Sequence, residues 1–164
     1  MADNAPDTLF LESLKDVYYT ERQILKALPK MERSAQSPDL KQAFHAHRLE
    51  TEGQVERLQQ IFDLLKQRAH AQVCPAIDGI MDEGAEIIEK YSRSSALDAA
   101  LAATAQTVEH YEIARYGALC TWAETLGQTD VLALLQTTLE QEKAANQMLA
   151  LLAQSAISTA LAAE

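Results

Sequence analysis

The sequence predicts an all-α fold: an antiparallel four-helix bundle of two helical hairpins, joined by a long crossover that contains an extra short helix. Among its 164 residues only 5 are Gly and 4 are Pro, whereas Ala, Leu, Glu and Gln, which favour helix, are abundant. Aromatic residues, which favour strands, make up only 5% of the chain. The length is that of one domain, residues 1–164, with a substantial hydrophobic core.

The first predicted hairpin occupies the N-terminal part of the chain. Its first helix begins at Asp7 or Thr8, either of which can cap it. The second helix runs from about Pro38 to Arg68, after Ser37-Pro38-Asp39, which combines a capping Ser, Pro at the first helical position and an acid near the positive end of the helix dipole. Residues of mostly apolar character recur at helical spacing in the first helix: Phe10, Leu14, Val17, Glu21, Ile24 and Leu28. The corresponding stripe of the second helix has a polar centre: Leu40, Phe44, His47, Glu50 or Thr51, Gln54, Leu58, Ile61 and Leu65.

The crossover and the second hairpin follow. Residues 69–95 are the least regular part of the sequence and contain a short amphipathic helix from about Ala76 to Tyr91. The third bundle helix runs from about Ala96 to Leu126, and Gly127 is its predicted C-cap. The fourth helix begins at Thr129-Asp130. Its stripe again contains a glutamate: Leu132, Leu135, Leu139, Glu142, Asn146, Leu149 and Leu152 or Ala153.

Each bundle helix has a glutamate at the same distance from its turn. Glu21 and Glu50 lie about 15 residues on either side of the first turn, and Glu112 and Glu142 lie 15 residues on either side of Gly127. At about 1.5 Å rise per residue, each glutamate is about 22 Å from its turn, so antiparallel packing brings them level. The separations of 29 and 30 residues also indicate an internal duplication of a two-helix unit.

Four carboxylates at one level of a bundle core predict a dinuclear metal site. Bare carboxylates would repel one another, whereas two divalent cations would neutralise them and can be bridged by them. Glu109 adds a carboxylate on nearly the same helix face as Glu112, and His47 is the imidazole candidate, with a hydrogen-bonded core histidine as the alternative. The oxygen-rich ligands favour two iron ions, with manganese or zinc as alternatives. The predicted ligands are Glu21, His47, Glu50, Glu109, Glu112 and Glu142, with Gln54 and Asn146 able to complete or support the set.

Charge and hydropathy exclude several other functions. The net charge of −10 argues against binding to nucleic acid or to anionic lipid. No segment is apolar over the roughly 18 residues that a membrane span needs, and the N-terminus lacks the pattern of a signal peptide. Cys74 and Cys120 lie far apart in no C-x-x-C pair, so we expect reduced thiols in a cytoplasmic protein.

Five phrases distributed over nearly the whole chain resemble ferritin-like bundles and, more closely, the bacterial YciE/YciF-type stress proteins. They are D-V-Y-Y-T-E-R-Q-I-L-K-A-L-P-K-M (16–31), E-T-E-G-Q-V-E-R-L-Q-Q-I-F (50–62), D-E-G-A-E-I-I-E-K (82–90), V-E-H-Y-E-I-A-R-Y-G-A-L (108–119) and L-E-Q-E-K-A-A-N (139–146). The resemblance implies a ferritin-like four-helix fold with an added helix, homodimers, and a link to osmotic or oxidative stress.

The chain departs from the wider ferritin-like pattern in its histidines. Many such sites use E-x-x-H on the second and fourth helices, whereas this second helix has the reverse order, His47-x-x-Glu50, and no His lies near Glu142. Two classes of function remain open. One is a di-iron protein that reacts with oxygen or peroxide, and the other is a non-catalytic scaffold with a structural metal or none.

Overall fold

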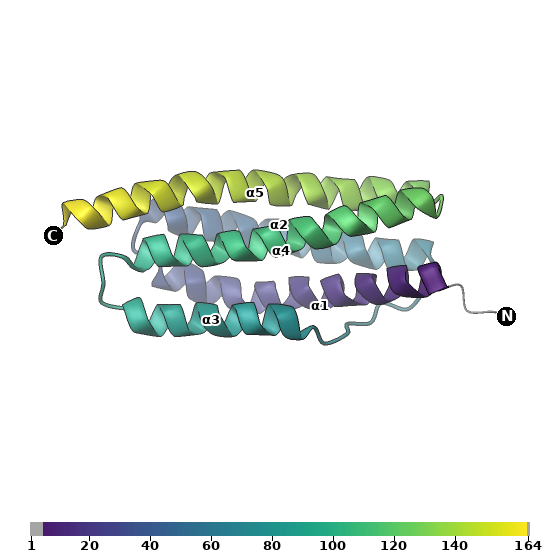
Figure 1. Ribbon diagram of the computed structural model, residues 1–164, viewed down its shortest axis with the longest axis horizontal. Helices are drawn as coiled ribbons and strands as arrows, with labels where there is room; N and C mark the ends of the chain where they lie inside the picture. Colours follow the sequence, from purple (N-terminus) through teal and green to yellow (C-terminus); the bar gives the residue numbers. More distant parts are fainter. Residues whose placement is uncertain (1–4, 164) are drawn as a thin grey trace.

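The computed structural model describes residues 5–163, in which the chain forms five helices and no strand (Figure 1). This confirms the all-α prediction. The helices are α1 (Ala5–Ser34), α2 (Pro38–Leu64), α3 (Pro75–Tyr91), α4 (Leu97–Thr125) and α5 (Thr129–Ala162).

Two helical hairpins, α1–α2 and α4–α5, pack side by side, with α1 next to α4 and α2 next to α5. Every neighbouring pair of these four helices is antiparallel (Figure 1). The crossover leaves the end of α2, and α3 carries it back along the outside of the bundle, against α1 and α4, to the start of α4. The predicted bundle with an extra crossover helix is therefore confirmed.

The helix ends show where sequence signals suffice. The hydroxyl of Ser37 accepts a hydrogen bond from the backbone N–H of Leu40 (3.4 Å), so the predicted cap of α2 is confirmed. Gly127, with φ +69°, follows the last turn of α4 in the left-handed conformation that favours glycine.

The end of α2 differs from the prediction, because the helix stops at Leu64 and not at Arg68. Lys66 adopts φ +54°, and its N–H bonds to the Asp63 carbonyl while the Gln67 N–H bonds to the Phe62 carbonyl. These two bonds form the Schellman motif that usually contains glycine at its left-handed position. Since Lys66 takes that position here, the sequence lacks the glycine that would have marked the end of α2.

The core consists of two hydrophobic clusters, one towards each end of the bundle. One cluster lies towards the α1–α2 turn and includes Leu28, Phe44 and Leu101. The other lies towards the α4–α5 turn and includes Leu14, Leu58 and Leu135. The residues between them along the helices are polar, so the apolar core is interrupted at the level that the sequence predicted.

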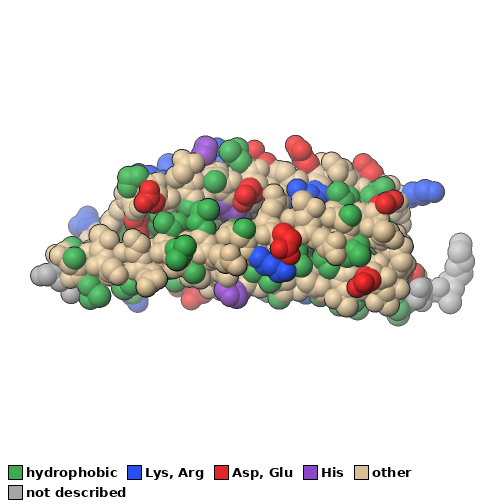
Figure 2. Space-filling model, turned by 90° about the horizontal axis from the view of Figure 1, so that it is seen from above, with side chains coloured by type: hydrophobic (Ala, Val, Ile, Leu, Met, Phe, Trp, Pro, Cys, Tyr) green, Lys and Arg blue, Asp and Glu red, His purple; other side chains and the backbone are tan. Residues whose placement is uncertain are grey.

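The surface carries mixed charge. On the face shown in Figure 2, acidic, basic and apolar side chains are interspersed, without a continuous basic patch. Within residues 5–163, none of the helices is both long enough and apolar enough to cross a membrane.

Candidate metal centre

Four glutamates form a buried layer between the two hydrophobic clusters. Glu21 comes from α1, Glu109 and Glu112 from α4, and Glu142 from α5, and each is at most 1% exposed. Glu109 and Glu112 point the same way because residues three apart share a helix face. These carboxylates thus lie together in one part of the core, at the level that the equal spacings predicted.

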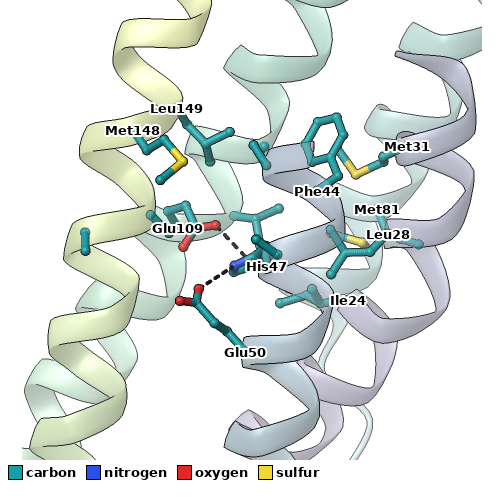
Figure 3. A pocket seen from close by; sticks show the side chains of 17 residues that line it. Ile24, Leu28, Met31, Phe44, His47, Glu50, Met81, Glu109, Met148 and Leu149 are labelled. Atoms are coloured by element: carbon teal, nitrogen blue, oxygen red, sulfur yellow. Dashed lines mark ion pairs between the residues drawn. The ribbon is translucent and has the colours of Figure 1, made fainter. Parts of the chain in front are cut away.

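His47 joins this layer from α2, the one bundle helix that contributes no glutamate to it. Its side chain is buried, and its Nε2 lies 3.3 Å from Oε1 of Glu109 (Figure 3). One ligand atom from each of four side chains lies within 4.8 Å of all the others: His47, Glu109, Glu112 and Glu142. A single ion can be reached by ligands at such separations, so the geometry fits a metal site.

Glu50 lies at the edge of the cluster. Its side chain is 45% exposed, and its Oε2 is 4.0 Å from Nδ1 of His47. The buried position beside it on α2 belongs to Thr51, whose hydroxyl donates to the His47 carbonyl (2.9 Å). The sequence left Glu50 and Thr51 as alternatives on the stripe, and the helix turns Thr51 into the core.

The cluster contains many buried polar atoms that lack a hydrogen-bond partner within the described chain. They include five carboxylate oxygens and both ring nitrogens of His47. The oxygens are Oε2 of Glu21, Oε2 of Glu109, both oxygens of Glu112 and Oε2 of Glu142. Buried polar atoms are almost always satisfied in folded proteins, and these are the donor types that hold iron, manganese or zinc. The residues therefore fit a carboxylate-rich metal centre.

Burial and mutual repulsion set the protonation of this layer. Burial, reinforced by neighbouring carboxylates, raises the pKa of Glu21 and of Glu112 well above the ordinary value. The same causes raise the pKa of Glu109 to about 11, and burial raises that of Glu142. Burial lowers the pKa of His47 to about 4, so its imidazole is neutral at pH 7, as a metal ligand must be. Without cations the layer retains protons, and bound cations would replace them.

A second layer of side chains orients the carboxylates. The hydroxyl of Tyr116 donates a hydrogen bond to Oε1 of Glu21, and Nε2 of Gln54 donates one to Oε1 of Glu142. Arg57 supports the same side of the cluster through Thr138, 2.7 Å from its Nη1. Side chains in such positions fix the orientation of metal ligands.

Periodicity placed Gln54 on the core-facing stripe beside the glutamates, whereas the sequence analysis did not single out Tyr116. Tyr116 lies four residues after Glu112, on the same helix face, which is the signal that could have found it. Oδ1 of Asn146 accepts a hydrogen bond from Nε2 of Gln106 (3.5 Å).

The sequence of the chain matches a family of known proteins. The family described as "Domain of unknown function (DUF892)" matches residues 5–162. Protein YciF of Escherichia coli K12 is 44% identical over 139 residues, which are 84% of each chain.

Solved structures agree with this match. The crystal structure of the E. coli stress protein YciF superimposes with a TM-score of 0.90 at 41% identity, covering 94% of this chain and 98% of that one. YcfI from Rhodopseudomonas palustris, described as a candidate structural protein, gives a TM-score of 0.87 at 47% identity, covering 91% and 96%. The ferritin-like fold and the resemblance to YciE/YciF-type proteins are thus confirmed.

Proposed function

We propose, from the premise that this chain belongs to the DUF892 family, that it is a stress-response protein whose buried carboxylates hold two metal ions, most suitably iron. One observation supports this more than any other. Five carboxylate oxygens and the His47 imidazole converge in the core without hydrogen-bond partners among the described residues. A folded protein that buries such groups unpaired loses free energy, and cations recover it.

The charge balance supports two divalent ions. The four buried glutamates carry four negative charges when ionised, which two divalent cations neutralise. Glu109, Glu112, Glu142 and His47 would hold one ion, and Glu21 together with its neighbouring carboxylates would hold the other. Glu50 lies at the edge, where it can complete the set by rotating its exposed side chain.

Iron in such a site would supply electron-transfer chemistry with oxygen or peroxide. The chain's own groups have three tasks. The neutral imidazole of His47 binds without adding charge, Tyr116 and Gln54 hold two carboxylates in fixed orientations, and the flanking hydrophobic clusters exclude water. The proposal extends to the homodimer and the cytoplasmic location that the family resemblance implies, which analytical ultracentrifugation and cell fractionation would test.

The first experiment is a metal analysis of protein purified without added metal. An anaerobic Fe(II) titration with an oxygen pulse follows. We expect two irons per chain and a ferric absorption in the near ultraviolet after oxygen is added.

Three variants make the test specific. Glu112→Gln and Glu142→Gln each remove one buried carboxylate, and we expect the loss of at least one iron per chain. Glu140→Gln, an exposed change two residues before Glu142, is the matched control and should bind two. Full binding by both buried variants would show that the metal lies elsewhere.

The alternative is a non-catalytic scaffold, which the description of YcfI as a candidate structural protein favours. Absence of stoichiometric metal, together with no reaction with oxygen, would support this alternative.

A further inference from the structure

A cavity of about 100 Å³ lies beside the carboxylate layer, within the hydrophobic cluster towards the α1–α2 turn. His47 and Glu109 lie at one side of it, with Glu50 near them (Figure 3). The other lining side chains are apolar, among them Leu28, Phe44 and Leu149. The polar groups of the cavity are therefore confined to its boundary with the metal centre.

The cavity reaches the surface between α2 and α5. Small side chains from both helices line this side, including the partly buried Ala43 and Ala46 of α2 and the exposed Ala144 of α5. Met148, also of α5, is 53% exposed. Alanines leave a gap where larger residues would close the contact between the two helices, so a small molecule has an entry path.

The lining contains every methionine of the described chain. Met31 comes from α1, Met81 from the crossover helix α3, and Met148 from α5. Methionine is unbranched and flexible, and it is common on surfaces that adapt to different ligands. The walls from three helices can thus adjust to the shape of a ligand.

We propose that this cavity binds a small, neutral, apolar molecule and holds it against His47 and Glu109 at the edge of the carboxylate layer. The size limits the ligand, because an engineered apolar cavity of about 150 Å³ accommodates benzene or xenon. The lining limits its polarity, because a charged molecule would lose its hydration without gaining partners along the apolar walls. The substrate class of the centre is accordingly a short hydrocarbon or an apolar gas, and this part of the inference rests on the proposed function.

Xenon is a suitable probe because it matches the size and chemistry of the cavity. The protein is labelled with ¹³C-methyl methionine, treated with EDTA and equilibrated with xenon under pressure. We expect the methyl signals of all three lining methionines to shift in a saturable manner. Unchanged signals would overturn the inference.

Variants that fill the cavity locate the binding. Ala105→Leu fills it from α4 and Ala145→Leu fills it from the more exposed α5 side, so one of them remains informative if the other does not fold. Both should lose the xenon response. Ala133→Leu makes the same change on an exposed position of α5 away from the cavity and should retain it. Xenon-induced shifts that persist in a folded, filled variant would overturn the inference.

A comparison of two metals tests whether the bound xenon lies next to the metal centre. Protein loaded with paramagnetic Mn(II) should relax bound ¹²⁹Xe faster than protein loaded with Zn(II), with metal content measured in both. Equal relaxation in protein that contains metal would overturn the placement. Xenon binding without any metal uptake would disprove the proposed metal centre and leave the cavity as a binding site. Metal uptake without xenon binding would disprove the cavity as a binding site and leave the proposed metal centre standing.

Discussion

The hydroxyl of Tyr116 on α4 donates a hydrogen bond to Oε1 of Glu21 on α1, inside the core. Both side chains are fully buried, and the other oxygen of Glu21 has no hydrogen-bond partner within residues 5–163. One oxygen of this carboxylate is therefore held by Tyr116, while the other receives no hydrogen bond from a described donor. Burial raises the pKa of Tyr116 well above its ordinary value, so the hydroxyl remains a donor at any physiological pH.

Tyr116→Phe removes this donor and leaves the shape of the ring intact. We expect the free energy of unfolding of the metal-free protein to fall by about 1–3 kcal/mol, because a buried carboxyl oxygen loses its partner. We also expect metal affinity to fall by about 10–100-fold, as for other residues that orient ligands. Urea unfolding in EDTA and a metal titration would measure the two effects.

Tyr111→Phe is the matched control for this variant. Tyr111 lies on the same helix, but its hydroxyl contacts Cys74 (3.0 Å) and Arg115 (3.1 Å) and not the carboxylate layer. Its loss should leave metal affinity unchanged. Equal metal affinity in Tyr116→Phe and the wild type would contradict the orienting role.

Periodicity and spacing predicted much of this structure. The symmetric positions of Glu21, Glu112 and Glu142 about the two turns sufficed to predict their common level, because the rise per residue is fixed in a helix. Glu50 shares that level, but the choice between it and its neighbour Thr51 depends on the rotation of α2, which packing sets. Periodicity therefore predicts the level of a residue along the bundle better than it predicts whether its side chain points into the core.

Other features depend on tertiary contacts that a single sequence does not display. The left-handed Lys66 ends α2 without a glycine, and Tyr116 has the appearance of an ordinary core residue until α1 packs against it. The cavity beside His47 is likewise a consequence of how five helices meet, and no local pattern indicates it.

The stability of the metal-free protein should fall as pH rises above neutrality. The pKa values of Glu21, Glu109, Glu112 and Glu142 are raised in the folded state, so it keeps protons that the unfolded chain releases above about pH 4.3. Each such group lowers the free energy of unfolding by about 1.4 kcal/mol per pH unit until its folded pKa is reached. His47 has the opposite effect on stability, because its pKa is lowered to about 4 in the folded state. Its contribution changes with pH only below the unfolded pKa of about 6.5.

Urea unfolding in EDTA between pH 6.5 and 8 measures this dependence where His47 no longer contributes. Glu112→Gln removes one retained proton, so its slope should be shallower than that of the wild type by about 1.4 kcal/mol per pH unit. Glu140→Gln, at an exposed site, should have the wild-type slope. A wild-type stability that is flat over this range would show that the buried carboxyls do not hold their protons.

Gln54→Glu should make folding depend on metal. Gln54 is fully buried and donates from its amide to Glu142, so the substitution replaces a donor with another carboxyl group beside an acidic cluster. We expect lower stability in EDTA at pH 8 and a larger stabilisation by divalent metal than in the wild type, because repulsion rises and a ligand is added.

Thermal unfolding with and without metal gives the comparison for this variant. Gln60→Glu, an exposed change on the same helix, adds the same charge outside the core and is its control. Equal metal-induced stabilisation in Gln54→Glu, Gln60→Glu and the wild type would place Gln54 outside the influence of the ions.

Asp98 joins the two hairpins at the end of the bundle far from the α4–α5 turn. Its carboxylate, near the start of α4, accepts hydrogen bonds from the backbone N–H groups of Gln36 (2.7 Å) and Ser37 (2.6 Å) in the α1–α2 turn. Asp98→Ala should lower the free energy of unfolding by about 3 kcal/mol, because two backbone donors lose a charged acceptor. Asp98→Asn keeps one acceptor oxygen and should lose less, whereas Asp82→Ala, on the exposed side of α3, should lose little.

Metal stoichiometry distinguishes a structural role of Asp98 from a role in the centre. Because Asp98 sets the position of a turn and contributes no group to the carboxylate layer, folded Asp98→Ala should still bind two ions per chain if the wild type does. A stoichiometric loss of metal in the folded variant would mean that the level of the glutamates depends on this turn contact. The antiparallel packing of the long helices alone would then be insufficient to align them.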